Sequence, residues 1–387
     1  MKKITLITNT KKGKGGANVA RDRLIKILKK NFRIETRTID KKNLIGKIKY
    51  YIVRVIIRIF IGKTNFLNSL NIFTRVNLKN IKTDLVLINW IGEETLSLMD
   101  LRKINKPIVW TLQDMWATTS TEHFLDSSKK NGYSKKDTKG NLIKNQIYKK
   151  KIFLYDKKNI NIITNSKWLE NFSKKSDLTK RLNTKTIYNP IKAENWFRES
   201  EHNSKLKLNL DPKVQYILYG ANGGLKNFRK GGDLFLEAIS KIGMINKKLE
   251  VIVLGGDQNY LEKSQNINFH HRKFNPDIKI QRMYHSSSIL TVCPSRAESL
   301  PQFIVETILC QNPVVSFNQG GMSEIVSHKF NGYLVKCYDT KDFATGIDYC
   351  IKNIKKENLV KSRKVIYKLF EEKKALKEYT NFINKII

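Results

Sequence analysis

The stretch Ser295-Arg-Ala-Glu298-Ser-Leu-Pro301-Gln-Phe-Ile-Val-Glu306 places two glutamates eight positions apart. It follows residues 288–293, a short apolar run typical of a buried strand. Pro301 suits the first turn of a helix, where a missing N–H costs no hydrogen bond. The stretch therefore predicts a strand-to-helix corner, with Glu298 in the loop and Glu306 a little over one turn into the helix. In an open α/β sheet, ligands bind at this edge.

The residue types at this corner suit a ligand that has both hydroxyls and phosphates. A carboxylate accepts paired hydrogen bonds from neighbouring hydroxyls, so a sugar or a ribose is the natural partner of Glu298 and Glu306. Free N–H groups at the helix start favour an anion, most often phosphate. Two solvated surface glutamates are the alternative interpretation.

Length and charge limit the possible classes of protein. The 387 residues exceed what one core usually serves, which predicts two domains. Lys and Arg total 73 against 34 Asp and Glu, a net charge of +39. Nucleic-acid binding, attraction to an anionic membrane surface and a general drift towards lysine are three explanations. Since the lysines are spread along the chain, we assign part of the excess to drift and the rest to an anionic surface or substrate.

The cysteines indicate a reducing compartment. Cys293, Cys310, Cys337 and Cys350 form no C-x-x-C pair and lie in apolar segments, which predicts buried free thiols. The first eight residues are too short an apolar run for a secretory leader and are typical of a strand. We expect no stretch that spans a bilayer.

Strands and helices alternate along the chain, which is typical of a doubly wound parallel sheet. The expected strands of the first half lie at residues 4–8, 34–39, 85–89, 107–112 and 160–165, with helices at 17–30 and after Ser166, a helix N-cap candidate. A strand at 186–191 ends at a break, and 194–209 reads as linker and loop. The second half has expected strands at 215–219, 249–254, 288–293, 313–317 and 332–335, and helices at 231–242, 277–285, 323–327 and 373–387. Residues 124–148 are polar with little periodicity, which indicates a mobile loop on the acceptor side.

Residues 44–63, Leu44 to Lys63, are strongly apolar yet are interrupted by Lys47, Lys49, Arg54 and Arg58. Five apolar residues recur at helical spacing, and Lys47, Arg54 and Arg58 share another side. A basic amphipathic helix of this kind can lie in a membrane interface. A domain helix whose apolar stripe faces the sheet is the equal alternative.

These motifs together resemble glycosyltransferase family 4, retaining enzymes with the GT-B architecture. Glu298 and Glu306 match the family's E-x7-E signature, and Lys230-Gly231 resembles its phosphate-binding K-G position. Residues 319–326 and 331–335 resemble its G-G-x-x-E and N-G-x-L-V tail, and Gly15-Gly16 resembles its glycine loop. The resemblance covers nearly the whole chain and is strongest from 216 to 335.

The resemblance implies an α/β fold of two Rossmann-like, doubly wound domains that face each other across a cleft. Residues 1–190 would form the acceptor-side domain and 191–365 the nucleotide-sugar-binding domain, with a C-terminal helix at 366–387 that crosses back to the first domain. No metal or other cofactor is expected, because the chain has no D-x-D cluster and GT-B enzymes typically work without one.

The resemblance also implies roles for individual residues. Glu306 would bind the donor ribose, and Glu298 would hold sugar hydroxyls near the transferred carbon. Lys230, with Arg229, would neutralise the diphosphate leaving group, since a fixed cation stabilises the charge that develops there. Further donor-binding positions are Gly15, Gly16, Ser299 and Leu300.

The first half contains Thr111-Leu-Gln113-Asp114-Met-Trp116, which resembles a T-L-H-D-M-W loop of bacterial polysaccharide transferases. Gln113 occupies the position of the family's histidine, so it can position a sugar but cannot transfer a proton. Asp114 and Trp116 are candidate sugar contacts, with loop packing as the alternative. His123 is a candidate for the acceptor pocket, with a loop histidine of no chemical role as the alternative.

The predicted function is a hexosyl-type glycosyltransferase that moves a sugar from a nucleotide diphosphate sugar to a glycan or lipid-linked acceptor, as in O-antigen or capsule assembly. The expected location is cytoplasmic and peripheral at the inner membrane face. A nucleotide-sugar epimerase or hydrolase, a catalytically inactive relative prompted by Gln113, and a basic nucleic-acid-binding protein are the alternatives. Against the last, the chain shows no concentrated basic patch interleaved with aromatics and no known nucleic-acid-binding motif, so no nucleic-acid partner is expected.

Overall fold

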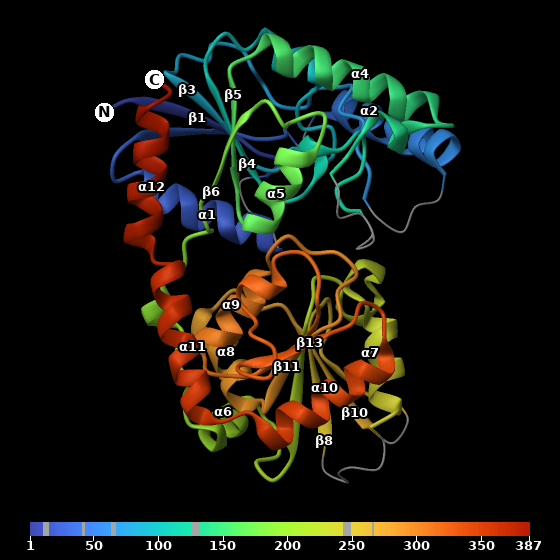
Figure 1. The fold of residues 1–387 in the computed structure, drawn as a ribbon, viewed down its shortest axis with the longest axis vertical. Coiled ribbons are helices and arrows are strands. Elements are labelled where there is room, and N and C mark those ends of the chain that lie inside the picture. The colour runs from blue at the N-terminus through green and yellow to red at the C-terminus, as the bar shows by residue number, and fades with distance from the viewer. Residues whose placement is uncertain (11–14, 41–42, 63–66, 126–131, 243–248, 265–266) are drawn as a thin grey trace. The chain divides into compact units, whose positions relative to one another are not determined.

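The computed structural model describes residues 1–10, 15–40, 43–62, 67–125, 132–242, 249–264 and 267–387. The chain divides into two compact units (Figure 1). Unit 1 comprises Met1–Pro190 and Glu372–Ile387, and unit 2 comprises Ile191–Glu371. The sequence placed the C-terminal boundary at 366, whereas the structural division falls at Glu372.

Unit 1 is built on a six-stranded parallel sheet in the order β2-β1-β3-β4-β5-β6. Its short apolar runs are buried on both faces, as parallel strands covered by helices are. The strands are β1 (Lys3–Ile7), β2 (Arg33–Arg37), β3 (Leu85–Ile88), β4 (Ile108–Leu112), β5 (Ile160–Thr164) and β6 (Asn183–Thr186).

Helices cover both faces of this sheet. They are α1 (Gly16–Leu28), α2 (Leu44–Ile56), α3 (Leu98–Lys103), α4 (Leu142–Lys157), α5 (Lys167–Lys175) and α12 (Glu372–Asn384). Because strand side chains alternate between faces, Ile4 and Leu6 pack with α1 and α12, whereas Ile7 packs in the cluster that contains α2 and α4 residues. Ser166 is the N-cap of α5, as predicted, and its hydroxyl accepts from the Leu169 N–H at 3.2 Å.

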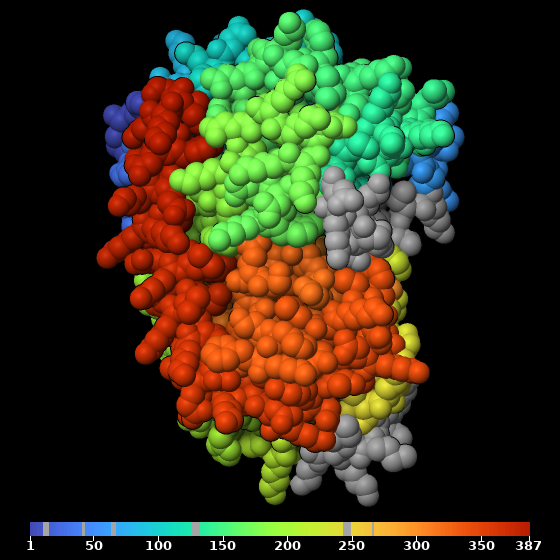
Figure 2. Space-filling view, in the orientation of Figure 1, coloured from blue at the N-terminus to red at the C-terminus, as the bar shows by residue number. Residues whose placement is uncertain are grey.

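The C-terminal helix α12 is part of unit 1. Tyr379 and Ile383 are buried against α1 and the sheet, and the Lys2 ammonium donates to the Ile387 carbonyl at 2.9 Å. Figure 2 shows the outer face of α12 in red beside the dark-blue N-terminal residues.

Unit 2 has a seven-stranded sheet in the order β13-β12-β11-β7-β8-β10-β9, parallel except for the pair β9 and β10. The strands are β7 (Gln215–Gly220), β8 (Leu249–Gly256), β9 (Tyr260–Ser264), β10 (Ile267–Lys273), β11 (Leu290–Cys293), β12 (Val314–Phe317) and β13 (Gly332–Val335). The helices are α6 (Glu201–Lys207), α7 (Gly232–Ser240), α8 (Ile278–Ser287), α9 (Gln302–Leu309), α10 (Thr340–Asn353) and α11 (Lys356–Leu369).

Several predicted elements were wrong. The expected linker at 194–209 contains helix α6, which begins at the N-cap Ser200. The expected loop at 124–148 includes the start of α4, and residues 126–131 of it lie outside the described residues. The helix expected at 323–327 is a single 3₁₀ turn, Met322–Glu324. The strand expected at 186–191 is β6, three residues earlier. Strand β9 was missed because its side chains are mostly exposed, and β10 because polar residues such as His270 and His271 interrupt its apolar pattern.

Candidate functional site

The predicted strand-to-helix corner lies at the carboxyl end of β11 in unit 2. Glu298 is in the loop after β11, and Glu306 is in the second turn of α9. Pro301 is the N-cap residue, so the helix starts one residue later than predicted. Both glutamates are buried, with 9% and 5% of their surface exposed, which contradicts the interpretation of two solvated surface side chains.

Glu298 forms ion pairs with the two cations that the sequence had singled out. The Arg229 Nη1 atom lies 3.0 Å from Glu298 Oε1, and the Lys230 ammonium contacts the same oxygen. Arg229 also donates to the Ala297 carbonyl at 2.9 Å. Burial acts to raise the pKa of Glu298, but the charges of Lys230 and Arg229 outweigh it, so the pKa lies below its usual value. The carboxylate is therefore ionised at neutral pH.

Glycines bring the loops of this site together. Gly231, the N-cap of α7, has φ +68°, and a Cβ on it would meet the Pro294 carbonyl oxygen at 1.9 Å. Gly320 has φ +56°, and a Cβ there would meet the Glu298 carbonyl oxygen at 1.8 Å. Both positions require glycine because other residues rarely adopt this backbone and have no space for a side chain. The loops after β7, β11 and β12 therefore pack closely at one edge of the sheet.

The remaining donor-side residues lie on the same loop. Ser299 and Leu300 are each 4% exposed, and the Ser299 carbonyl accepts from the Gly321 N–H at 2.7 Å. These contacts fix the loop that contains Glu298. The predicted donor-binding roles of Ser299, Leu300 and Glu306 stay predictions.

The predicted glycine loop of unit 1 precedes helix α1. Gly15 is its N-cap with φ +107°, and a Cβ on Gly16 would meet nothing within 4 Å. The first part of the turn, Lys11 to Lys14, lies outside the described residues.

Gln113 directly follows β4 in unit 1. Its amide exchanges two hydrogen bonds with Asn189, at 3.2 and 3.0 Å, and accepts a weaker one from Asn165 at 3.5 Å. The two asparagines were not among the site residues predicted from the sequence. Each follows a parallel strand, and that position was the available signal.

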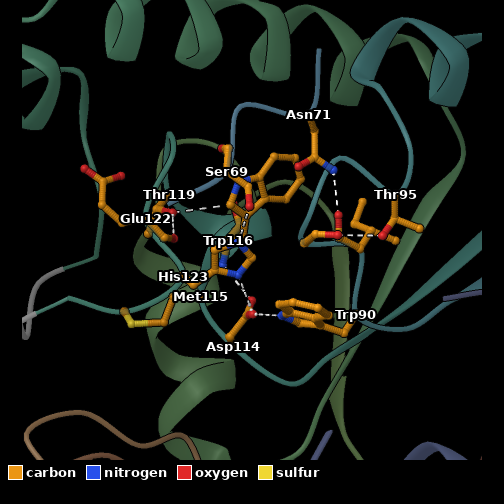
Figure 3. A network of polar contacts seen from close by, with 12 residues as sticks. Ser69, Asn71, Trp90, Thr95, Asp114, Met115, Trp116, Thr119, Glu122 and His123 are labelled. Carbon is orange, nitrogen blue, oxygen red and sulfur yellow. Dashed lines mark hydrogen bonds and ion pairs between the residues drawn. The ribbon is translucent and has the colours of Figure 1, made fainter. Parts of the chain in front are cut away.

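Asp114 and His123 form a buried hydrogen-bonded pair that the sequence did not predict. The Asp114 carboxylate lies between the Trp90 indole nitrogen, at 2.5 Å, and His123 Nδ1, at 2.6 Å (Figure 3). The other ring nitrogen of His123 lies 2.9 Å from the Ser69 hydroxyl. Burial acts to raise the pKa of Asp114, but His123 and the N–H donors outweigh it and lower it. His123, at 1% exposed, is therefore a hydrogen-bonded side chain of the buried network, and its predicted place in the acceptor pocket stays a prediction.

Trp116 packs inside this network. It is 2% exposed, its indole N–H donates to the Ser69 carbonyl at 2.8 Å, and the Lys151 ammonium lies 3.3 Å from the ring centroid. Lys151 is fully buried in α4 and donates to the Thr119 carbonyl at 2.9 Å and to the Trp116 carbonyl. Trp116 therefore packs within this loop, and its predicted contact with a sugar stays a prediction.

Two observations bear on cofactors and membranes. Within the described residues, no group of three or more His, Cys, Asp and Glu side chains could bind a metal ion, and the expected absence of a metal stays a prediction. In the same part of the chain, no helix combines the length and the apolar composition that crossing a bilayer requires.

The four cysteines are free thiols, as predicted, although Cys293 and Cys337 are only half-buried.

Comparison with known proteins shows that the second unit is similar to glycosyltransferases. Residues 201–365 match the model of the family Glycosyl transferases group 1. An uncharacterized glycosyltransferase of Methanocaldococcus jannaschii is 26% identical over 224 residues, which are 55% of this chain and 56% of that protein. An uncharacterized glycosyltransferase of Haemophilus influenzae is 34% identical over 71 residues, 18% of this chain and 20% of that protein. The chain thus spans about half of one curated relative and a fifth of the other.

Solved structures confirm the predicted fold. Anabaena HepE, in complex with UDP and glucose, has a TM-score of 0.68 at 14% identity and matches over 100% of both chains. Sucrose-phosphate synthase of Thermosynechococcus elongatus has a TM-score of 0.66 at 14% identity, over 100% of this chain and 99% of that one. The chain has the GT-B fold, and most of unit 2 is similar to the Glycosyl transferases group 1 family. These findings support a transferase activity.

Proposed function

We propose that the protein is a retaining glycosyltransferase that transfers a sugar from a nucleotide diphosphate sugar to a glycan or lipid-linked acceptor. The observation that supports it most directly is the partly buried cluster of Arg229, Lys230 and Glu298 at the carboxyl edge of the unit 2 sheet. Two adjacent cations there suit a diphosphate, and the neighbouring carboxylate suits sugar hydroxyls.

The chemistry explains why this cluster would accelerate the transfer. Breaking the bond between the sugar and the diphosphate builds negative charge on the leaving group. Arg229 and Lys230 are 22% and 16% exposed, so their charges are little screened by solvent. A preorganised cation of this kind typically lowers a barrier by about 3–4 kcal/mol. Glu298 keeps both cations in place before the diphosphate arrives.

The donor is proposed to be a UDP-sugar or a related nucleotide sugar. HepE, with the same fold over its whole length, was solved with UDP and with UDP-glucose. In our proposal Glu306 binds the ribose of the nucleotide. Its buried carboxylate lies in the second turn of α9, directly after the loop that contains Glu298. Retention at the anomeric carbon is proposed from the E-x7-E resemblance.

The acceptor is proposed to be located at an anionic membrane surface, as in surface-polysaccharide assembly. Helix α2 and the π-helical turn after it (Ile57–Ile61) bury Val53 and Ile57, at 1% and 6% exposure, in the core of unit 1. The opposite side is apolar and exposed, which argues against the alternative of a stripe facing the sheet. We call this side the α2 apolar face; its residues, 47–68% exposed, are Leu44, Ile45, Ile48, Tyr51, Ile52, Val55, Ile59 and Phe60.

Charge favours a membrane over a protein partner for the α2 apolar face. Lys47, Arg54 and Arg58 are exposed along its border, and no acidic residue occurs between Leu44 and Lys63. An apolar face flanked by cations inserts into the headgroup region of anionic lipid. The net charge of +39 adds a longer-range attraction of the same sign. The proposed location is therefore the inner face of the cytoplasmic membrane.

The proposal is tested first by ligand binding. UDP-, GDP- and TDP-sugars are added singly, and the melting temperature is measured, since a ligand that binds only the folded state raises it. The purified chain is then assayed for release of the nucleoside diphosphate with and without acceptor. Glu306→Gln should retain the fold and lose turnover.

Each outcome of these assays bears on the proposal. Full activity of Glu306→Gln contradicts the site assignment. Free sugar formed without acceptor, at the rate of transfer, supports the hydrolase alternative. Tight binding to nucleic acid with a steep salt dependence, and no stabilisation by any nucleotide sugar, overturns the proposal.

A further inference from the structure

Unit 1 has a carboxamide after each of five neighbouring strands. The residues are Asn9, Asn89, Gln113, Asn165 and Asn189, which follow β1, β3, β4, β5 and β6. These strands are adjacent in the sheet in that order and all parallel. Since parallel strands end at the same edge, the five amides form one line along it. We call this set the amide row.

The two ends of the amide row differ in their hydrogen bonding. Gln113 and Asn189 bond each other twice, and Asn165 approaches Gln113 at 3.5 Å. Asn89 is only 1% exposed, yet neither its amide nitrogen nor its amide oxygen has a partner among the described residues. Within the same described set, the side-chain oxygen of Asn9 also lacks one, at 8% exposure.

An amide buried in this way is unfavourable unless something else completes its hydrogen bonds. Asn89 lines a cavity together with Trp90, Gln113, Asp114 and His123. The cavity has a volume of about 10 Å³, which is room for one water molecule or one hydroxyl group. A sugar ring does not fit inside, but one of its hydroxyls does.

The chemistry of the row selects the class of ligand. An amide both donates and accepts, as a hydroxyl does, and it has no net charge. A phosphate or carboxylate would find no cation among the five residues, and the carboxylate of Asp114 next to the cavity would repel it. An uncharged polyhydroxylated group is the ligand that these residues complement.

We propose that the amide row recognises an uncharged sugar unit and that Asn89 binds one of its hydroxyls inside the cavity. The inference rests on the proposed function for the choice of a sugar, and it adds that the unit bound in unit 1 is neutral. Gln113 then fits the row, because a histidine at that position would introduce a titratable group into an otherwise uncharged set.

The test combines Asn89→Leu, Asn89→Asp and a control, Asn171→Leu, on the exposed side of α5. Binding of glucose and N-acetylglucosamine, and of glucuronic acid and glucose 6-phosphate as charged counterparts, is measured by saturation-transfer NMR. We expect the wild type and the control to bind a neutral sugar more tightly than the charged ones. Both Asn89 variants should bind it at least tenfold more weakly.

Two further measurements separate the possible failures. Asn89→Leu should not lower the melting temperature, because it removes an amide without a protein partner; a large decrease would show a structural role and overturn the inference. Stabilisation by UDP is measured in parallel on every variant. If UDP binds but neutral sugars bind the Asn89 variants as well as the wild type, the amide row proposal is wrong and the proposed function is not. If UDP and nucleotide sugars bind none of the proteins, the proposed function fails.

Discussion

Arg229 Nη1 and the Lys230 ammonium both contact a single oxygen of Glu298, Oε1. Two cations on one carboxylate leave an excess of one positive charge at the edge of the unit 2 sheet. This excess is available to a diphosphate, and the carboxylate maintains the positions of both cations until it arrives.

Replacing Lys230 tests that arrangement. Lys230→Ala should lower kcat by about 10²–10³-fold, because a fixed cation stabilises the leaving group mainly in the transition state. The free energy of unfolding should fall by only about 1–3 kcal/mol, since Arg229 still pairs with Glu298. Steady-state kinetics and urea unfolding measure the two effects. Lys279→Ala, an exposed lysine on α8, is the matched control, and an unchanged kcat in Lys230→Ala would contradict the role.

The α2 apolar face predicts a graded dependence on lipid. Ile52→Asp and Val55→Asp should abolish co-sedimentation with vesicles that contain anionic lipid and leave the melting temperature unchanged, because both side chains are about half exposed. Each change of Lys47, Arg54 or Arg58 to Gln should weaken binding about fivefold, which corresponds to about 1 kcal/mol for each basic residue near such a surface.

Val365→Asp supplies the control for the lipid experiment. Val365 is 64% exposed on α11, in unit 2, and lies outside the α2 apolar face. If this variant loses vesicle binding as Ile52→Asp does, or if neutral vesicles bind the wild type equally well, the face is not a site for an anionic membrane.

The acid stability of unit 2 should depend on His285. This residue is fully buried, and burial lowers its pKa from 6.5 to about 3. Between these values the unfolded chain binds a proton that the folded chain does not. The stability is therefore complete above pH 6.5 and decreases as the pH falls towards 3, by a few kcal/mol in total. Urea unfolding from pH 7 to pH 4 measures it.

His285→Phe removes that titration and retains the ring contacts with Trp196 and Phe303. Its unfolding free energy should depend less on pH between 6.5 and 4 than that of the wild type. Equal slopes would show that His285 is protonated in the folded state. The remaining acid sensitivity below pH 4.5 is expected from Glu298, whose lowered pKa contributes stability that is lost as it becomes protonated.

Lys151 should determine the stability of the loop that contains Asp114 and His123. Lys151→Met retains the aliphatic stem but leaves the Trp116 and Thr119 carbonyls without their donor, which should cost about 1–3 kcal/mol. Burial lowers the pKa of Lys151 well below 10.5, so the wild type should become more stable as the pH rises towards that value. The variant should lack this rise, and denaturant unfolding at alkaline pH distinguishes the two. An equal rise in both proteins would contradict the assignment.

Gly231, from the K-G motif, and Gly16, from the glycine loop, should respond differently to alanine. Gly231→Ala places a Cβ 1.9 Å from a carbonyl oxygen at a positive φ, and we expect a loss of several kcal/mol or failure to fold. Gly16→Ala meets no atom within 4 Å at the start of α1, so its stability should be unchanged or rise by up to about 1 kcal/mol. If Gly16→Ala keeps the melting temperature of the wild type but binds the donor more weakly, the substitution acts directly on donor binding. Unchanged donor affinity would contradict the predicted role of Gly16.

The sequence identified most of the parallel strands because a strand covered on both faces must be apolar throughout, as in β3, β4, β5 and β11. It failed for β9, whose side chains are mostly exposed and follow no apolar period. It also failed for the partners of His123. Ser69 and Asp114 come from separate loops, and no local pattern relates loops that a fold brings together.

The residues of this chain by themselves determined the alternation of strands and helices, the corner with Glu298 and Glu306, and the amphipathic character of 44–63. These depend on spacing and on local backbone preference, which neighbouring residues encode. Tertiary structure decided which side of α2 is buried, that Arg229 and Lys230 meet Glu298 across nearly 70 residues, and that five amides share one edge. Those relationships depend on the order of strands in each sheet, which results from the packing of the whole unit and not from any single segment.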